Sequence, residues 1–306
     1  MSSEVENLVV GSSAMVDGIG YRVVGVKHGG MGVVRLLKRT VAGDLEPVVY
    51  KALLAAKTFN DADDIETRKL VTNELKHWLP LKHQNVVELL ALGDLNFQLA
   101  ALMPVAQTSI EELRVERGVM PVASVVEVLR QAACGLEYAW STRHLLHLDV
   151  KPANLLVMGE DGGRRNVCVS DWGMSAVRSA SHGGSKQGGT LPYMAPERFV
   201  SEAQQSCSWD VFSLGITFLR LTTNEFPLDV NANIPNQLVS GAYLGRAASL
   251  LGRTNLHTHA QRAVLFLIHP NPQQRISNYG DVYDALDEIG RNRRWTFPWT
   301  RKQLWA

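Results

Sequence analysis

The spacing of hydrophobic and polar positions changes once along the chain, near residue 105. Before that point, runs of apolar and β-branched residues predict three strands, at Tyr21–Val26, Val33–Leu37 and about Val48–Phe59. Two more apolar runs, Val86–Leu92 and Phe97–Val105, predict a fourth and a fifth strand. The first part of the chain is therefore expected to form a small lobe of five strands.

One helix is expected between the third and fourth strands. Asn60 and Asp61 can cap its first turn, and Pro80 ends it. One face of this helix carries Val71, Glu74, Leu75 and Trp78.

Helical spacing dominates from about residue 109 onward. A long amphipathic helix is predicted from the apolar positions Val125, Leu129, Ala132, Ala133, Leu136 and Trp140. The short runs Leu155–Met158 and Val167–Ser170 predict a hairpin joined by the loop Gly159–Asn166. Val211–Leu221 has little polar face and predicts a buried helix.

A strand-rich lobe followed by a helical lobe, with ligands at the junction, is an α+β architecture. We expect an N-terminal extension over 1–19 and a small lobe over 20–103. The hinge and large lobe then span 104–290, and a basic, tryptophan-rich tail spans 291–306.

Composition adds few constraints. The 306 residues are 45% hydrophobic and 20% charged, with a net charge of +1, which gives no reason to expect a nucleic-acid partner. Three widely separated cysteines make a disulfide framework improbable, and no apolar run reaches the length of a membrane span. The N-terminus lacks the pattern of a secretory signal, so a cytoplasmic location is expected.

Three glycines, Gly29, Gly30 and Gly32, lie between the first two predicted strands. Without a Cβ, glycine lets backbone N–H groups approach phosphate oxygens closely. A plain tight turn explains this cluster equally well when it is considered alone.

The polar loop His147–Asn154 carries the strongest chemical signal. Phosphoryl transfer needs a carboxylate at the attacking hydroxyl, a cation beside the transferred group and oxygen ligands for magnesium. The loop supplies Asp149, Lys151 and Asn154, and Asp171 follows one hairpin later. An ordinary polar loop would have to produce these residue types at these offsets by chance.

On these residues the chain resembles the eukaryotic-type serine/threonine protein kinases, from about residue 20 to residue 285. The resemblance implies the two-lobed kinase fold, with ATP and a protein as substrates and Mg²⁺, or alternatively Mn²⁺, as cofactor. It implies that Asp149 orients the substrate hydroxyl and accepts its proton, and that Lys151 stabilises charge on the phosphoryl group. Asn154 and Asp171 would bind the metal, and Trp172 replaces the phenylalanine of the usual DFG.

The large lobe carries three further matches to this family. Gly189–Glu197 resembles the segment ending in APE. Asp210 resembles the aspartate that anchors the catalytic-loop backbone, and Arg275 resembles the arginine that pairs with the APE glutamate, here Glu197.

In the small lobe, the glycines and Val34 resemble the later part of the motif GxGxxGxV, so Gly29, Gly30, Gly32 and Val34 are expected to contact ATP. Lys27 stands where the family has the first glycine, which could reshape the cover over the adenosine.

The family also needs a lysine on the third strand that pairs with a helix glutamate, here Glu74. Lys57 follows Ala55 in an A-x-K pattern, whereas Lys51 lies nearer the family's spacing from the glycines. The two lysines are six residues apart, so strand alternation cannot decide between them. We favour Lys57, because its interval to Glu74 suits a short turn and one helix; the other lysine would be solvated.

Met103, Pro104 and Ala106 are expected at the hinge, where backbone groups of residues 104 and 106 can meet adenine. Met103 would be the gatekeeper; alternatively it is simply a core methionine.

The pattern of Lys151 with Thr190 resembles that of serine/threonine kinases rather than tyrosine kinases. Many kinases have an arginine at the position of Leu148, where it binds a phosphate on the activation loop. Leucine has no donor, so this non-RD chain is expected to be active without loop phosphorylation. The loop serines are phosphorylation candidates or merely solvated: Ser175, Ser179, Ser181 and Ser185.

Two alternatives remain beside an active kinase. Lys27 and Leu148 favour a pseudokinase that binds nucleotide or partners, and a small-molecule phosphotransferase can share an aspartate–asparagine loop. The tail 291–306 either packs on the large lobe or docks a partner.

Overall fold

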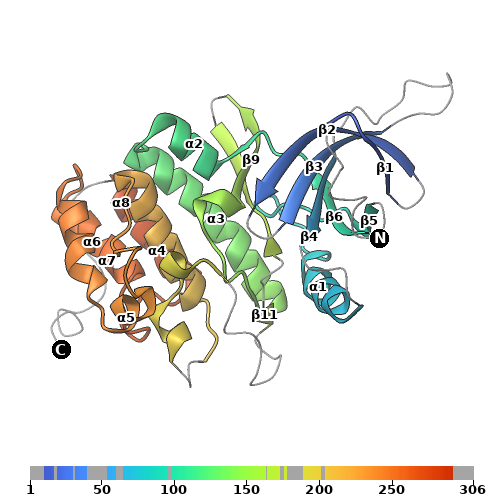
Figure 1. Ribbon diagram of the computed structural model, residues 1–306. Coiled ribbons are helices and arrows are strands. Elements are labelled where there is room, and N and C mark those ends of the chain that lie inside the picture. The colour runs from blue at the N-terminus through green and yellow to red at the C-terminus, as the bar shows by residue number, and fades with distance from the viewer. Residues whose placement is uncertain are drawn as a thin grey trace. The chain divides into compact units, whose positions relative to one another are not determined.

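The computed structural model describes residues 10–16, 19–29, 32–39, 54–59, 65–95, 98–162, 164–172, 176–177, 189–200 and 204–291. The chain forms two compact units, Met1–Gln107 and Thr108–Ala306. The first is rich in strands and the second in helices (Figure 1), as the predicted α+β class requires.

The first unit is a closed antiparallel barrel with the strand order β1-β2-β3-β4-β6-β5. Its strands are β1 (Ser13–Val16), β2 (Ile19–Gly29), β3 (Gly32–Arg39), β4 (Leu54–Phe59), β5 (Ala91–Leu95) and β6 (Gln98–Pro104). Five of them correspond to the five strands that the sequence predicts.

The fourth predicted strand begins later than the apolar run suggests, at Ala91 instead of Val86. Val86, Val87 and Leu89 are buried without belonging to a strand. The Trp78 indole N–H donates to the Val87 carbonyl at 2.7 Å, so a side chain satisfies this buried backbone group in place of a strand partner.

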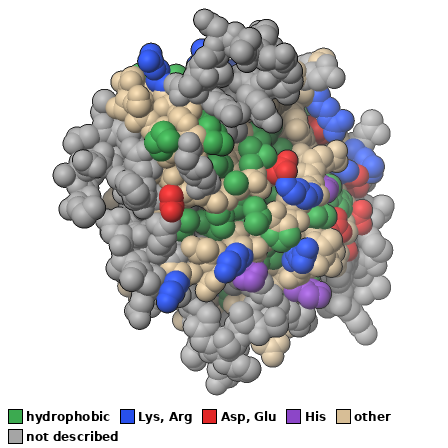
Figure 2. All heavy atoms as spheres, turned by 90° about the vertical axis from the view of Figure 1, so that its right-hand side faces the viewer, with side chains coloured by type: hydrophobic (Ala, Val, Ile, Leu, Met, Phe, Trp, Pro, Cys, Tyr) green, Lys and Arg blue, Asp and Glu red, His purple; other side chains and the backbone are tan. Residues whose placement is uncertain are grey.

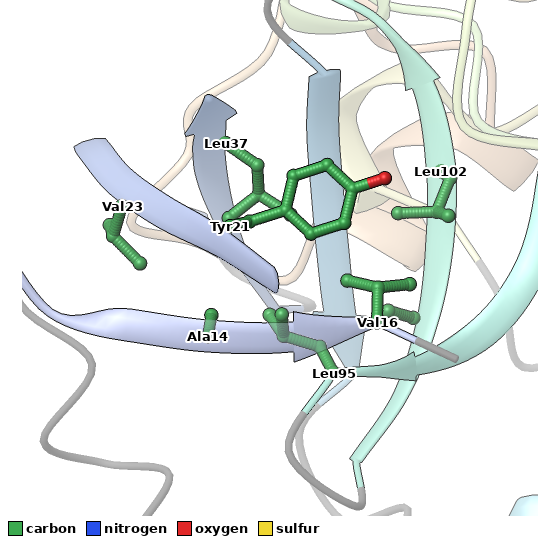
Figure 3. Close-up of a cluster of buried hydrophobic side chains, with 8 residues drawn as sticks. Ala14, Val16, Tyr21, Val23, Leu37, Leu95 and Leu102 are labelled. Carbon is green, nitrogen blue, oxygen red and sulfur yellow. The ribbon is translucent and has the colours of Figure 1, made fainter. Parts of the chain in front are cut away.

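Strand β1 comes from the segment that was expected to be an extension. Its burial alternates, with Ala14 and Val16 inside the barrel. Val16 pairs with Leu95 of β5 and thereby closes the barrel. Figure 3 shows both side chains in the barrel core, whose buried members are Ala14, Val16, Tyr21, Val23, Leu37, Leu95, Ala100 and Leu102.

The predicted helix of this unit is α1 (Ile65–Trp78). Its Leu75 and Trp78 side chains are fully buried, in agreement with the predicted apolar face. The predicted caps Asn60 and Asp61 lie outside the described residues.

The second unit is built around two long helices, α3 (Val122–Arg143) and α4 (Ser208–Thr223), both of which the apolar spacing predicts. Helix α3 packs against α4 and α8, and α4 packs against α6 and α7. The remaining helices are α2 (Ile110–Arg117), α5 (Ile234–Val239), α6 (Tyr243–Gly252), α7 (Thr258–Leu267) and α8 (Tyr279–Arg291).

The predicted hairpin in this unit has longer strands and a shorter turn than expected. It consists of β9 (Leu155–Asp161) and β10 (Arg164–Val169), so most of the predicted loop Gly159–Asn166 is strand. Gly162, with φ of 56°, makes the tight turn possible. Charged residues of the predicted loop pair across the two strands instead, with Glu160 opposite Arg165.

The short strands of this unit are β7 (Thr108–Ser109), β8 (Leu145–Leu146) and β11 (Ala176–Val177). Short 3₁₀ turns are η1 (Pro152–Asn154), η3 (Leu191–Tyr193) and η4 (Pro196–Phe199).

The three cysteines all lie in described ranges and none forms a disulfide; Cys168 and Cys207 are buried and Cys134 is half-buried. Among the described helices, none combines the length and the apolar composition that crossing a membrane requires. Figure 2 shows one face of the molecule on which hydrophobic side chains gather near the centre, with charged side chains of both signs scattered around them.

Candidate active site

Three polar side chains bind Asp149, the acidic residue of the loop between β8 and β9. Lys151 and Asn154 belong to the same loop, and Thr190 lies just before η3. Asp149 is only 2% exposed. Thr190 donates to its Oδ1 at 2.8 Å, and Lys151 donates to its Oδ2 at 2.7 Å. The Lys151 ammonium also donates to the Thr190 hydroxyl at 2.6 Å. The carboxylate, the cation and the hydroxyl therefore form one connected group.

Asn154 holds the same aspartate from the other end of the loop. Its amide nitrogen donates to the Asp149 carbonyl at 2.8 Å and to the Asp149 Oδ2 at 3.1 Å. The turn η1 places Asn154 there, because Pro152 fixes the first position of that turn. Since the amide nitrogen is used in these two bonds, the amide oxygen is the atom left to bind a ligand.

The hairpin β9–β10 returns the chain to this loop and brings Asp171 beside it. Both the backbone N–H and the hydroxyl of Ser170 donate to the Asn154 carbonyl, at 2.9 and 3.1 Å. Asp171 follows directly, with a left-handed φ of 64° that a non-glycine residue rarely adopts. The predicted Asp171 therefore directly follows a residue that is hydrogen-bonded to the predicted Asn154.

His147 joins the loop to the end of β10. The Asp149 backbone N–H donates to its Nδ1 at 3.2 Å, so the ring proton lies on Nε2, which is 2.8 Å from the Ser170 carbonyl. The ring of Trp172, the residue in place of the DFG phenylalanine, lies edge-on to His147 with centroids 4.7 Å apart. Trp172 is fully buried and donates to the Val169 carbonyl at 3.2 Å.

Asp210, at the start of α4, anchors the backbone of the loop, as the sequence predicts. Its two carboxylate oxygens accept from the backbone N–H groups of His147 and Leu148, at 2.8 and 2.9 Å. Burial raises the pKa of Asp210, and these two bonds act against that rise.

The predicted pair of Glu197 with Arg275 is present as a two-pronged ion pair. The Arg275 Nη1 and Nη2 donate to the two Glu197 oxygens at 2.7 and 2.8 Å. Arg275 also donates to the carbonyls of Ser208 and His269, which ties η4 to α4 and to the segment after α7.

Arg198 is a residue of this site that the sequence analysis missed. It is 3% exposed, and its Nη1 donates to the Leu148 carbonyl at 2.9 Å. The only sequence signal is its position directly after the APE segment, where a charged residue follows a stretch that packs inside the protein.

In the first unit, strand register brings several predicted ATP-binding positions onto one face of the sheet. Val34 pairs with Lys57, and Ala55 pairs with Met103. Residues two apart on a strand share a face, so these four positions do too. Gly29 and Gly32 pair at the end of the β2–β3 hairpin.

The choice between Lys57 and Lys51 stays open. Lys57 lies in β4, whereas Lys51 lies outside the described residues, as does Gly30. Glu74 lies in α1. Its pairing with either lysine remains a prediction.

The predicted hinge residues lie at and just after the end of β6, the strand that pairs with β4. Met103 is 6% exposed, and Pro104 and Ala106 are half-buried. Pro104 ends β6.

The oxygen donors of the loop fit a magnesium ion that keeps water and phosphate ligands. Asn154 offers an amide oxygen and Asp171 a carboxylate, and Mg²⁺ is usually held by one or two such groups together with substrate phosphates. Within the described ranges, no three His, Cys, Asp or Glu side chains are grouped to hold a metal by themselves.

Comparison with known proteins gives consistent matches. A family model described as the protein kinase domain matches residues 26–287. Serine/threonine-protein kinase PknJ of Mycobacterium tuberculosis is 30% identical over 272 residues, which cover 87% of this chain and 44% of PknJ. The chain therefore spans less than half of that relative's length.

A shorter match covers the dual specificity mitogen-activated protein kinase kinase jkk-1 of Caenorhabditis elegans. It is 37% identical over 106 residues, which are 34% of this chain and 23% of that protein. Among solved structures, the Mycobacterium tuberculosis PknI kinase domain superposes with a TM-score of 0.64 at 23% identity, covering 92% of this chain and 99% of that one. This likeness confirms the two-lobed kinase fold that the sequence predicts.

Proposed function

Since the chain belongs to the protein kinase family, we propose that it transfers the γ-phosphoryl group of ATP to serine or threonine hydroxyls of protein substrates. The observation that carries the proposal is the convergence of Lys151, Asn154 and Thr190 on the Asp149 carboxylate. A carboxylate held by three donors has a fixed position, which is what orienting an attacking hydroxyl requires.

Asp149 is the proposed acceptor of the hydroxyl proton. Each carboxylate oxygen has two acceptor positions, so the substrate hydroxyl can donate to one oxygen while Thr190 and Lys151 keep their bonds. The hydroxyl oxygen bonds to the γ-phosphorus, the bond from that phosphorus to the bridging oxygen breaks, ADP leaves, and the proton passes to Asp149. Lys151 places a cation where charge on the transferred group needs stabilisation.

Asn154 and Asp171 are the proposed ligands of Mg²⁺, which neutralises phosphate charge when it is bound. In the first unit, nucleotide contacts are proposed for residues of the glycine hairpin, the neighbouring strands, helix α1 and the hinge. These are Gly29, Gly30, Gly32, Val34, Ala55, Lys57, Glu74, Met103, Pro104 and Ala106.

Serine/threonine specificity is proposed from the contact of Lys151 with Thr190 and from the names of the relatives. Leu148 supports independence from loop phosphorylation, because its side chain has no donor for a phosphate. Phosphatase treatment should therefore leave activity in place; a complete loss would contradict this part of the proposal.

The proposal is tested by comparing the wild-type chain with Asp149→Asn. Both are incubated with labelled ATP, magnesium and generic basic and acidic proteins. We expect the variant to lose about 10²- to 10⁴-fold in rate, the usual contribution of a general base. Phosphoamino-acid analysis of the product should show phosphoserine or phosphothreonine.

Equal label transfer by both proteins would overturn the catalytic assignment. The alternative is a nucleotide-binding pseudokinase, which Lys27 and Leu148 favour. It predicts a rise in melting temperature with ATP and magnesium, but no transfer by the wild-type chain.

A further inference from the structure

We propose that Arg198 is a positioning residue for the catalytic loop: its guanidinium holds the Leu148 carbonyl and thereby sets the place of Asp149. The inference rests on the kinase activity proposed above and concerns the regulation of that same site.

The first support is the burial of Arg198 together with its hydrogen bond. Its Nη1 lies 2.9 Å from the Leu148 carbonyl oxygen, across fifty residues of sequence, and only 3% of the residue is exposed. Burying a guanidinium costs considerable free energy unless it is paired and hydrogen-bonded. Its place inside the protein is explained by the group to which it donates.

The second support is where that carbonyl lies in the backbone. The peptide unit between Leu148 and Asp149 is planar, with the Leu148 carbonyl on one side and the Asp149 N–H on the other. Arg198 binds the carbonyl at 2.9 Å, and His147 Nδ1 accepts from the N–H at 3.2 Å. The peptide that leads into Asp149 is therefore held on both sides.

Leu148 needs such support, because its backbone is strained. Its φ of 68° lies in the left-handed region, which leucine seldom occupies. Asp210 accepts from the Leu148 N–H at 2.9 Å, but this bond does not determine the rotation of the peptide between Leu148 and Asp149. Arg198 supplies the restraint that Asp210 does not.

Gly189 gives a third, independent observation at the same point. A Cβ on Gly189 would lie 2.6 Å from the Leu148 carbonyl oxygen and 3.1 Å from Arg198 Nη1, and its φ is +108°. Only glycine leaves room for the guanidinium to reach the carbonyl here. The next residue, Thr190, donates to the Asp149 side chain itself. The segment Gly189–Thr190 therefore lies against both the peptide that leads into Asp149 and its carboxylate.

The acidic groups around Arg198 favour the cationic form of its side chain. Burial lowers its pKa, while the nearby acids Asp210, Asp149 and Glu197 act in the opposite direction. An arginine side chain keeps its proton in proteins. The guanidinium also lies over the Trp209 ring, 5.5 Å from its centroid, which fixes its plane.

Arg198 and Leu148 together determine whether the catalytic loop depends on phosphorylation. At position 148 the chain lacks a cation that a loop phosphate could bind. The cation that contacts this part of the loop comes instead from η4, in the folded core. Its position depends on folding alone, so the loop is held in place whether or not the activation segment is phosphorylated.

The test compares the wild-type chain with Arg198→Met, Arg198→Lys and Arg130→Met. Methionine keeps much of the packing over Trp209 but removes the donors. Arg130 is the control, because it is an arginine that also lies over an aromatic ring, Tyr283 at 5.6 Å, and pairs with Asp287, so both of these contacts are with α8. All proteins are phosphatase-treated and measured below the lowest melting temperature of the set.

We expect Arg198→Met to lower kcat by about 10- to 100-fold, the effect of misplacing a reacting group by about 1 Å, with an unchanged KM for ATP. Arg198→Lys should fall between it and the wild type, and Arg130→Met should retain the wild-type kcat.

A folded Arg198→Met with the wild-type kcat overturns the inference, as does an equal loss in Arg130→Met. If Arg198→Met does not fold, Arg198→Lys decides: a wild-type kcat overturns the inference, and a kcat reproducibly below the wild-type value at constant KM supports it. A wild-type chain that transfers no phosphate overturns the underlying kinase proposal instead, so the two failures are distinguishable.

Discussion

At the scale of single residues, Thr190 connects the cation and the carboxylate of the candidate site. Its hydroxyl accepts from Lys151 at 2.6 Å and donates to Asp149 at 2.8 Å, so one O–H group satisfies both. Hydrogen bonds to charged groups are worth about 1.5–3 kcal/mol, more than neutral ones. The hydroxyl therefore adds a second link between two oppositely charged groups that also contact each other directly at 2.7 Å.

Replacing Thr190 by valine should lower kcat by about tenfold, the equivalent of about 1.4 kcal/mol. Valine keeps the shape but removes the hydroxyl, so Lys151 and Asp149 each lose one of the hydrogen bonds that hold them. Steady-state kinetics with a peptide substrate measures the effect. Thr190→Ser, which keeps the hydroxyl, is the control and should remain within about threefold of the wild type. A fully active valine variant would show that the hydroxyl does not position the site.

The sequence predicts the residues of this site unevenly, for a physical reason. Asp149, Lys151 and Asn154 lie within one short loop, so their spacing alone reveals them. Arg198 acts on that loop from fifty residues away, and its role depends on a backbone conformation, the left-handed Leu148, that residue identity does not reveal. Contacts of this kind require coordinates.

At the scale of elements, helix α4 is the support on which the second unit is built. It is apolar almost all round and carries Asp210, which fixes the loop, at its first turn. Gly215 in the middle of this helix lets another segment approach closely. A Cβ there would lie 2.5 Å from the Ile268 side chain and 2.8 Å from Leu267.

Gly215→Ala should therefore destabilise the protein by about 1–3 kcal/mol, the usual cost of overpacking. The control is Gly245→Ala in α6, where a Cβ meets nothing within 4 Å. Alanine is the better helix former, so this second variant should be stabilised by up to about 1 kcal/mol. Urea denaturation followed by circular dichroism measures both. Opposite signs are expected; a loss of stability in both variants would refute the packing argument.

Element types are well predicted here, and element ends are not. The helical spacing finds α3 and α4, because each buries a continuous apolar face. The hairpin β9–β10 is found too, but its strands extend further than expected, since Glu160 and Arg165 form a cross-strand pair that their polarity alone does not reveal. Charged residues in a strand look like a loop until their partners are known.

At the scale of the whole molecule, each unit has its own core, and the core of the first depends on a strand that the sequence did not predict. The segment Ser13–Val16 is short and flanked by polar residues, so it resembles a terminal extension. Its alternation becomes meaningful only when its neighbours β2 and β5 are in place.

Val16→Asp should destabilise this core by about 3 kcal/mol or more, because a buried charge without a partner is costly. Val16 is 2% exposed, whereas the adjacent Met15 is 49% exposed. Met15→Asp therefore serves as the control and should change stability by about 0.5 kcal/mol or less. Thermal unfolding of both variants measures the difference. Equal effects would mean that β1 does not contribute to the core.

Closure by β1 also affects how the chain behaves toward other chains. An open five-stranded sheet would present rows of unpaired N–H and C=O groups on β2 and β5, which are templates for pairing with a foreign strand. Strand β1 pairs with both. These four residues thus cover part of both exposed edges, residues 19–22 of β2 and Leu95 of β5, which lowers the tendency of the first unit to aggregate edge to edge.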